Sequence, residues 1–304
     1  MKRAAIAIGS NSTRMLAADV RDGALYNRIR GREETRLFLG LDAAGKISPE
    51  KIIETAQAVD RLYRAARAYG AEQVDLIATS ATRDAGNSDA LAQLIRKLTR
   101  LELRVISGEE EARLAFMAVS EGKRRLVMDI GGGSTEWTIG EQNQVEGAVS
   151  MQVGASRLLK RLPINSPEDA KTVLNICREI MTLYAEQLKR LRPAPAMIGL
   201  GGSCTTSAAM TMGREAHGEE VEGRRITIRD AVEQLNKLAS MTMEERAHVP
   251  GLPPARAGHM PHGLCILITA MELWGFEELT VSGKTNLDGY LMYEDREEGI
   301  WQKN

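Results

Sequence analysis

Short apolar runs alternate with longer amphipathic stretches along the chain, which is the pattern of α/β domains. Near the N-terminus this pattern predicts a meander of three strands, at 3–9, 13–20 and 24–29. A helix is predicted from Pro49 to Gly70, because Ser48 can cap its first turn and one apolar stripe continues along it. The first half is completed by a strand, a helix and a strand, at 74–79, from 88, and at 102–106.

The second half repeats this order. It has strand-like runs, a long helix and a further strand, at 125–131, 134–140, 144–151, from 167, and at 196–202. Within it, "VMDIGGGSTEWTIG" at 127–140 matches "IAIGSNSTRMLAA" at 6–18 in outline. We therefore expect two α/β domains of similar topology, residues 1–122 and 123–304, facing one another with the repeated turns lining the cleft. A C-terminal helix could pack back on the first domain.

Composition narrows the class of protein. The 304 residues are 43% hydrophobic, and 40 Lys and Arg balance 41 Asp and Glu to a formal charge of -1, which argues against a sequence-independent nucleic-acid binder. The apolar stretches are shorter than a membrane span and the start does not read as a signal sequence, so we expect a cytoplasmic protein that binds no membrane. The three cysteines are expected to be core thiols. The closest histidine pair, His259 and His262, is expected to lie in a polar loop.

The turn in "DIGGGST" is a candidate phosphate site. The strand before it delivers Asp129 to its carboxyl end, and the glycines let the backbone turn tightly with exposed N–H groups. Asp129 and Glu136 could hold Mg²⁺ or its waters beside a phosphate. The alternative is a tight hairpin without a ligand. The residues that would cradle the phosphate here are Gly131, Gly132, Gly133 and Ser134.

Two further turns resemble this one. The first copy supplies polar side chains at the equivalent positions, Ser10, Asn11 and Ser12. A third turn, "GLGGSCTT" at 199–206, runs from a strand into a predicted helix, so Gly201, Gly202 and Ser203 would form an anion site at the helix N-terminus.

A helix predicted over 106–119 carries a candidate general base. Ser107 and Glu110 form a capping box, whereas Glu111 shares a face with apolar residues, where a carboxylate needs a partner or a role. If that face borders the cleft, Glu111 could take a proton from an attacking water. The alternative is a buried ion pair with Arg113 or Arg83.

Seven blocks of the sequence resemble, in order, those of the exopolyphosphatase/guanosine pentaphosphate phosphohydrolase family. They are "IGSNSTRML", "TSATRDAGN", "ISGEEEARL", "VMDIGGGSTE", "GLGGSCTT", "GLPPARAGHMPHGLCIL" and "LTVSGKTNLDGYLM". The resemblance implies two actin-like, ribonuclease H-like domains that hydrolyse terminal phosphates of inorganic polyphosphate or guanosine pentaphosphate with Mg²⁺. It also implies a homodimer.

The resemblance assigns roles to particular residues. It implies that Glu111 is the general base, that Asp129 and Glu136 place metal and water, and that Arg83 faces the substrate phosphates. The implied phosphate cradle includes Asn11, Ser12, Gly131, Gly132, Ser134, Gly201, Gly202 and Ser203.

Two positions depart from the family pattern. Ala7 stands where the family usually has aspartate, and Leu287 stands where it usually has arginine. An aspartate at position 7 is therefore expected to raise a Mg²⁺-dependent rate if the lost carboxylate limits the site. Since the chain has no room for the helical domains that the longer members append, we expect a short-chain or small-nucleotide substrate. The alternative is a catalytically weak sensor of the same fold that binds a nucleotide or polyphosphate.

Overall fold

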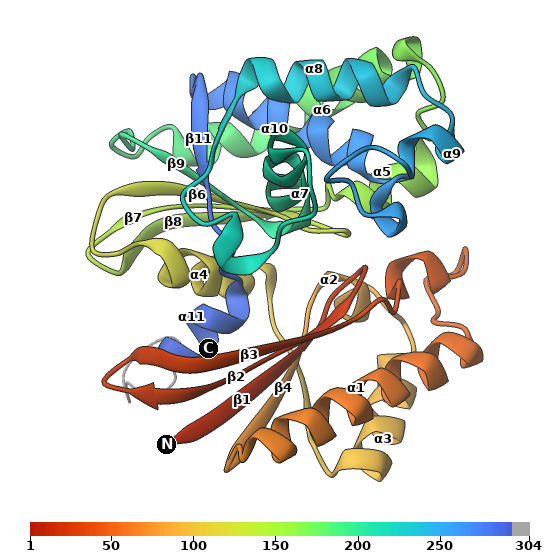
Figure 1. Ribbon diagram of the computed structural model, residues 1–304, viewed down its shortest axis with the longest axis vertical. Coiled ribbons are helices and arrows are strands. Elements are labelled where there is room, and N and C mark those ends of the chain that lie inside the picture. Colours follow the sequence, from red (N-terminus) through yellow and green to blue (C-terminus); the bar gives the residue numbers. More distant parts are fainter. Residues whose placement is uncertain (294–304) are drawn as a thin grey trace. The chain divides into compact units, whose positions relative to one another are not determined.

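The structure is a computed structural model that describes residues 1–293 (Figure 1). The chain divides into two compact units. The first comprises Met1–Ala118 and the described part of the segment that begins at Asn286, and the second comprises Val119–Thr285. Both units combine helices with a mixed β-sheet, as the predicted α/β class requires.

The first unit contains a five-stranded sheet in the order β3-β2-β1-β4-β5. Its strands are β1 (Lys2–Ile8), β2 (Thr13–Arg21), β3 (Ala24–Glu33), β4 (Gln73–Ala78) and β5 (Leu103–Val105). Strands β1, β2 and β3 form the predicted antiparallel meander, and β4 and β5 continue parallel to β1. Its helices are η1 (Leu37–Gly40), α1 (Pro49–Tyr69), α2 (Ser80–Arg83), α3 (Ser88–Thr99), α4 (Gly108–Val119) and α11 (Asn286–Tyr293).

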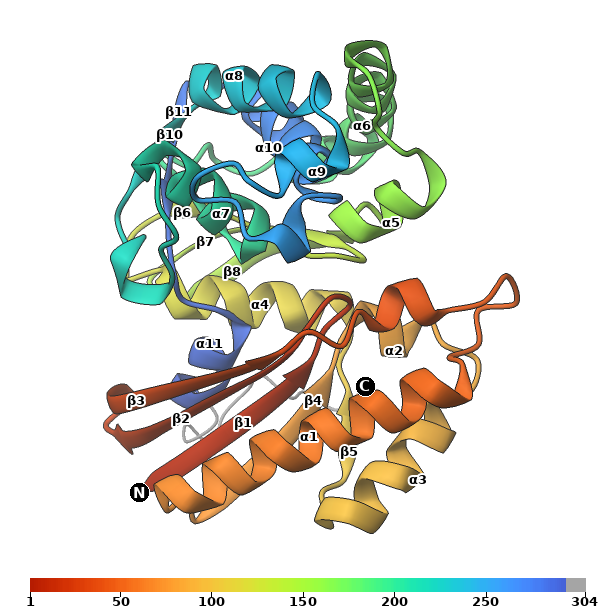
Figure 2. The same ribbon diagram turned by 45° about the vertical axis from the view of Figure 1, so that its right-hand side comes forward.

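Both faces of this sheet are covered by helices. Successive residues of β1 point to opposite faces, and from Ala4 to Ile8 the residues on both faces are apolar and buried. Ala4, Ile6 and Ile8 pack in the core with α1 and α3, whereas Ala5 and Ala7 pack in a second cluster with α4 and α11. Figure 2 shows α1 and α3 on one side of the sheet and α11 on the other. An ion pair ties α11 to β3.

That ion pair joins Arg30 on β3 to the fully buried Asp288 on α11. Its two nitrogen–oxygen distances are 3.1 and 2.7 Å. The C-terminal helix is therefore an integral part of the first unit. Removing one partner would leave the other charge buried and unpaired, which is strongly destabilising.

The second unit contains a six-stranded sheet in the order β10-β11-β9-β6-β7-β8. Its strands are β6 (Arg125–Ile130), β7 (Thr135–Glu141), β8 (Gln144–Met151), β9 (Met197–Leu200), β10 (Arg225–Thr227) and β11 (Glu278–Val281). Its helices are α5 (Ala155–Arg161), α6 (Pro167–Leu188), α7 (Gly201–Met212), η2 (Gly218–Glu220), α8 (Ile228–Ala239), α9 (Met243–Arg246), η3 (Pro254–Arg256) and α10 (Met260–Trp274).

The strand order β8-β7-β6-β9-β11 repeats the order β3-β2-β1-β4-β5 of the first unit, with the short β10 added at the edge. The directions also repeat, since β6 is antiparallel to β7 and parallel to β9. This is the ribonuclease H-like topology that the resemblance implied. The internal repeat seen in the sequence is therefore a repeat of the fold.

The side chains of the second core match some expectations and correct one. Trp137 and Trp274 pack edge to face with ring centroids 5.4 Å apart, and the three cysteines are buried and free, as predicted. The prediction that the histidine pair lies in a loop is wrong. Pro261 occupies the first turn of α10, where the backbone N–H that proline lacks would make no bond within the helix. His262 is consequently fully buried, with Nε2 2.8 Å from the carbonyl oxygen of Leu162.

Among the described residues, none of the helices combines the length and the apolar character that crossing a membrane requires.

Candidate active site

The acidic pair predicted in the second glycine turn lies on one face of the sheet. Asp129 on β6 is directly opposite Glu136 on β7, and residues so paired across antiparallel strands project to the same side. Glu136 is buried, and the hydroxyl of Ser150 on β8 donates a hydrogen bond of 2.7 Å to its Oε1. The pairing brings two carboxylates together at the point where the strand meets the turn.

The glycine turn itself is oriented by α5. The carbonyl oxygen of Gly131 accepts from the N–H of Ala155, and that of Gly132 accepts from the N–H groups of Ser156 and Arg157, at 2.8 to 3.1 Å. The Arg157 side chain bonds the next carbonyl, that of Gly133, at 2.6 Å. Because the C=O and N–H of a trans peptide point in opposite directions, these bonds turn the following N–H groups away from α5. The turn therefore presents donors on its other edge, as a phosphate cradle must.

The third turn, where β9 enters α7, lies beside Asp129. Gly201 has φ +83°, and a Cβ placed on it would lie 2.5 Å from Asp129 Oδ1. A Cβ on Gly202 would lie 1.8 Å from Nη1 of Arg256, so that guanidinium group sits against the start of α7. Ser203 is buried in the same turn. The second unit thus gathers two carboxylates, two glycine turns and an arginine.

Arg256 was not predicted as a site residue. Its block, "GLPPARAGHMPHGLCIL", contributed to the resemblance, but the position of the side chain depends on the close approach of η3 to α7. Only the absence of a side chain at Gly202 permits that approach. Gly202 has no positive φ, and nothing in the sequence around it indicates which side chain approaches.

The first turn has the same backbone geometry as the second. The N–H of Gly9 donates to the carbonyl of Ser12 at 3.1 Å, as Gly131 does to Ser134 at 2.9 Å. Here the turn carbonyls are bound by the segment that follows β3 and begins η1, since the N–H groups of Arg36 and Phe38 donate to the carbonyls of Asn11 and Ser10. The Ser10 and Ser80 hydroxyls share a hydrogen bond of 2.8 Å.

The side chains at the two turns differ in charge. Ala7 on β1 is directly opposite Arg14 on β2, at the positions that Asp129 and Glu136 occupy in the second unit. A Cβ on Gly9 would lie 3.9 Å from Arg14 Nη2, so the guanidinium group lies near the turn. Ala7 is apparent in the sequence, but its pairing with a cation is not, because the pairing depends on the register of the two strands.

Glu111 lies on the buried face of α4, as the apolar stripe predicted. It is 8% exposed, and its Oε2 is 3.7 Å from Nη1 of Arg83. The same Arg83 nitrogen donates to the carbonyl of Ile106 at 2.8 Å. Arg113, the other partner considered, is exposed. The structure therefore places the predicted general base beside the predicted phosphate-facing arginine. The same contact is also the ion pair with Arg83 that was the alternative to a catalytic role.

The capping box predicted at the start of α4 is confirmed. The Ser107 N–H donates to Glu110 Oε2 at 2.6 Å, and the Glu110 N–H donates to Ser107 Oγ at 3.1 Å. Glu110 is thereby committed to the helix end, which leaves Glu111 as the carboxylate of this turn on the buried face.

The donor set at Asp129 and Glu136 fits a substrate-assisted magnesium site. Among residues 1–293, no cluster of three or more histidine, cysteine or acidic side chains is placed to hold a metal ion. Mg²⁺ is usually bound through one or two carboxylates, with waters and substrate phosphates completing its octahedron. Two carboxylates beside a glycine turn are enough for such a site. A metal bound by protein groups alone would need more ligands than these two residues supply.

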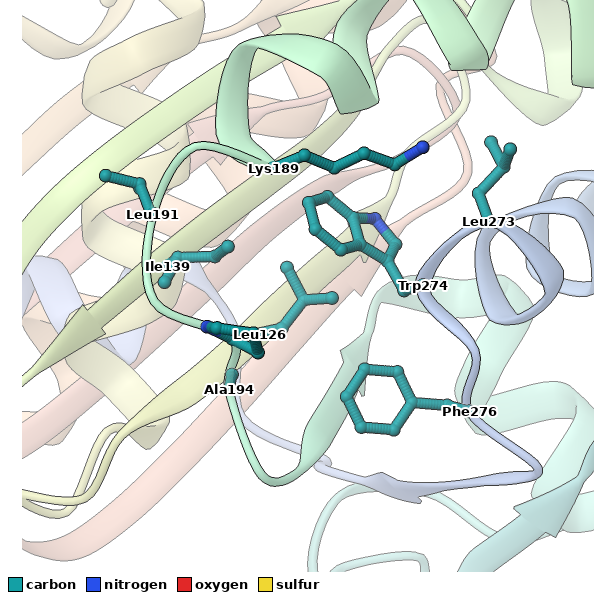
Figure 3. A pocket seen from close by; sticks show the side chains of 9 residues that line it. Leu126, Ile139, Lys189, Leu191, Ala194, Leu273, Trp274 and Phe276 are labelled. Atoms are coloured by element: carbon teal, nitrogen blue, oxygen red, sulfur yellow. The ribbon is translucent and has the colours of Figure 1, made fainter.

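An apolar cavity of about 210 Å³ lies elsewhere in the second unit (Figure 3). It is lined by Leu126, Ile139, Lys189, Leu191, Pro193, Ala194, Leu273, Trp274 and Phe276. Leu126 stands near the beginning of β6 and Asp129 near its end. The cavity is therefore distinct from the acidic pair, and its apolar lining is unsuited to a phosphate.

Comparison with known proteins identifies the family of the chain. Residues 16–295 match the Ppx/GppA phosphatase family. The chain is 32% identical over 308 residues to exopolyphosphatase 2 of Mycobacterium tuberculosis, covering 94% of this chain and 96% of that protein. It is 29% identical to the guanosine-5'-triphosphate,3'-diphosphate pyrophosphatase of Vibrio atlanticus, covering 96% of this chain and 58% of that longer protein.

Solved structures resemble the fold over almost the whole chain. The Ppx/GppA family member of Aquifex aeolicus is 26% identical with a TM-score of 0.81, covering 97% of each chain. An exopolyphosphatase from Cytophaga hutchinsonii, at 23% identity and a TM-score of 0.89 over 99% of this chain and all of that one, shows the fold alone. The predicted resemblance and the predicted class of enzyme, a hydrolase, are confirmed. The chain belongs to the Ppx/GppA phosphatase family.

Proposed function

We propose that the protein removes the terminal phosphate from inorganic polyphosphate of short chain length, from guanosine pentaphosphate, or from both. The observation that carries the proposal is the cross-strand pair of Asp129 and Glu136 beside two glycine turns. The names of the relatives, an exopolyphosphatase and a guanosine-5'-triphosphate,3'-diphosphate pyrophosphatase, support the two substrate classes.

Phosphate binding falls to the turns. The N–H groups that α5 orients, with the hydroxyls of Ser134 and Ser203, would donate to phosphate oxygens. Arg256, held against the start of α7, would add a guanidinium group. In the first unit, Ser10, Asn11 and Ser12 would serve in the same way.

Asp129 and Glu136 would hold Mg²⁺ or its waters. When bound, the ion would neutralise charge on the phosphate oxygens. The hydrogen bond from Ser150 keeps Glu136 in one orientation, so that the pair is arranged before the substrate arrives.

Glu111 would act as the general base. Its carboxylate would accept a proton from the attacking water while the water oxygen forms a bond to the terminal phosphorus and the bridging P–O bond breaks. The bonding pair then goes to the bridging oxygen of the leaving phosphate chain. Arg83, 3.7 Å from Glu111, would hold the carboxylate and offer charge to the phosphate.

Phosphate release tests this function. We would measure it with Mg²⁺ from short polyphosphate, long polyphosphate and guanosine pentaphosphate, beside the Glu111→Gln variant. Release by the native protein that falls at least about 100-fold in Glu111→Gln is expected for the loss of a general base. Glu109→Gln is the matched control, because Glu109 lies on the exposed side of the same helix turn.

The alternative function is a sensor, favoured by Ala7 and Leu287, which remove a carboxylate and a basic residue from the family pattern. A sensor would bind the same phosphate chains without releasing phosphate. Calorimetry that shows binding, together with no release from any of the three substrates, would establish it and reject the hydrolase. The cytoplasmic location and the homodimer remain predictions, and light scattering of the purified protein tests the second.

A further inference from the structure

A row of side chains crosses three strands at the second glycine turn. Asp129 on β6 is opposite Glu136 on β7, and Glu136 is opposite Ser150 on β8. The third residue supports the second, since the Ser150 hydroxyl donates to Glu136. This row is acidic, in keeping with the magnesium site proposed for it.

The equivalent row of the first unit is basic. Ala7 on β1 is opposite Arg14 on β2, and Arg14 is opposite Arg32 on β3. Two guanidinium groups thus project from adjacent strands on one face of the sheet. Like charges directly opposite one another are destabilising, so anionic groups, of the protein or of a ligand, are favoured beside such a pair.

Arg32 is tethered to the first glycine turn through one carboxylate. Its Nη2 lies 2.5 Å from Glu34 Oε1, and Asn11 Nδ2 donates to Glu34 Oε2 at 3.5 Å. Asn11 belongs to the turn itself. The tether therefore fixes the guanidinium group within reach of a ligand that occupies the turn, while the side chain stays 36% exposed.

Two arginines and one carboxylate lie at this turn, namely Arg14, Arg32 and Glu34. The turn N–H groups face away from the carbonyls that Arg36 and Phe38 bind. An arginine pair beside such a turn suits an extended polyanion, because guanidinium groups bind phosphate oxygens in a bidentate manner.

We propose that Arg32 is a specificity-determining residue that binds a phosphate beyond the terminal one in a phosphoanhydride chain. The inference rests on the proposed function, in which the end of that chain is bound at the glycine turns. The ligand class is a linear chain of three or more phosphates, either inorganic or attached to a nucleoside.

Binding and turnover together test the inference. We would measure the Kd of tripolyphosphate and of guanosine pentaphosphate with Mg²⁺ by calorimetry in the Glu111→Gln background, with and without Arg32→Gln. The loss of one charge-assisted contact is expected to raise Kd about tenfold. In the otherwise native protein, KM should rise by the same factor while kcat stays within about twofold. Weakening for one ligand only would identify the source of the chain.

Two variants serve as controls. Arg21→Gln removes the same charge at the far end of β2, where Arg21 is 66% exposed and paired with Asp19, and should leave Kd unchanged. Arg32→Lys keeps the charge but not the bidentate geometry, and should weaken binding by a smaller factor than Arg32→Gln. It also keeps the test open if Arg32→Gln does not fold.

The outcomes separate the two proposals. Unchanged Kd and KM in both Arg32 variants would overturn the role of Arg32, while phosphate release by the native protein would leave the proposed function in place. Conversely, Arg32-dependent binding without any turnover by the native protein would reject the hydrolase and keep the inference.

Discussion

Ala7 on β1 and Leu287 on α11 belong to one buried apolar cluster of the first unit, in which they are 3% and 1% exposed. These are the two positions at which the sequence departs from the family pattern. An acidic and a basic residue are therefore absent from the same cluster, and apolar side chains fill it. Replacing a buried ion pair by packed apolar residues is often neutral or stabilising, so we expect the effects of these two positions on stability to be coupled.

This coupling adds a cost in stability to an aspartate at position 7. A carboxylate there would be buried in an apolar cluster, with Arg14 on β2 opposite it but without the arginine of the family pattern, so Ala7→Asp is expected to lower the free energy of unfolding by about 2 kcal/mol. Urea denaturation followed by circular dichroism measures this. The double variant Ala7→Asp with Leu287→Arg should recover at least about 1 kcal/mol of the loss. Additive effects of the two single variants would contradict the coupling.

Most of the helices and strands could be predicted from local sequence signals such as capping residues and alternating apolar positions. Ser48 caps α1 as predicted, and Ser166 caps α6 in the same way, since each side chain accepts from a backbone N–H three residues later. The alternation in β1 places its residues on two faces. Helix α5 was not predicted, because its first N–H groups bond the carbonyls of the Gly131–Gly133 turn and no local cap marks its start. A helix capped by distant backbone leaves no pattern in its own sequence.

The candidate site was predictable to the extent that its residues lie in turns and on helix faces. Glu111 stood out because a carboxylate interrupts an apolar stripe. Arg14, Arg32 and Arg256 did not, because their placement depends on strand register and on close packing against a glycine. Contacts of that kind join residues far apart in the chain, so no pattern of spacing within the sequence predicts them.

The two glycines at the start of α7 are expected to respond differently to alanine. Gly201 has φ +83° and a Cβ there would lie 2.5 Å from the carbonyl oxygen of Ile130, so Gly201→Ala should lower the free energy of unfolding by at least about 2 kcal/mol. A Cβ on Gly202 meets only the flexible end of Arg256. Gly202→Ala should therefore change stability by less than about 1 kcal/mol and displace that guanidinium group.

Denaturation and phosphate release, measured on both variants, check this pair of predictions. Gly202→Ala should raise KM about tenfold if Arg256 contacts the substrate. A Gly202→Ala protein with the native KM would show that Arg256 has no part in binding. A Gly201→Ala protein as stable as the native one would show that the turn tolerates a side chain.

The buried His262 is expected to make stability depend on pH. Burial holds its pKa below the ordinary value of 6.5, so below pH 6.5 the unfolded chain takes up a proton that the folded state does not. The free energy of unfolding should therefore be constant above that pH and fall as the pH is lowered through the folded-state pKa, with a slope of up to about 1.4 kcal/mol per pH unit.

Urea midpoints at pH 7.5, 6.5 and 5.5 measure this slope above the range in which exposed carboxylates titrate. His262→Gln keeps an N–H that can reach the carbonyl of Leu162 but does not titrate, so its stability should change less over this range than that of the native protein. His248→Gln, at an exposed position, should retain the native slope. If His262→Gln lost stability on acidification as steeply as the native protein, the pH dependence would have to come from groups other than this buried imidazole.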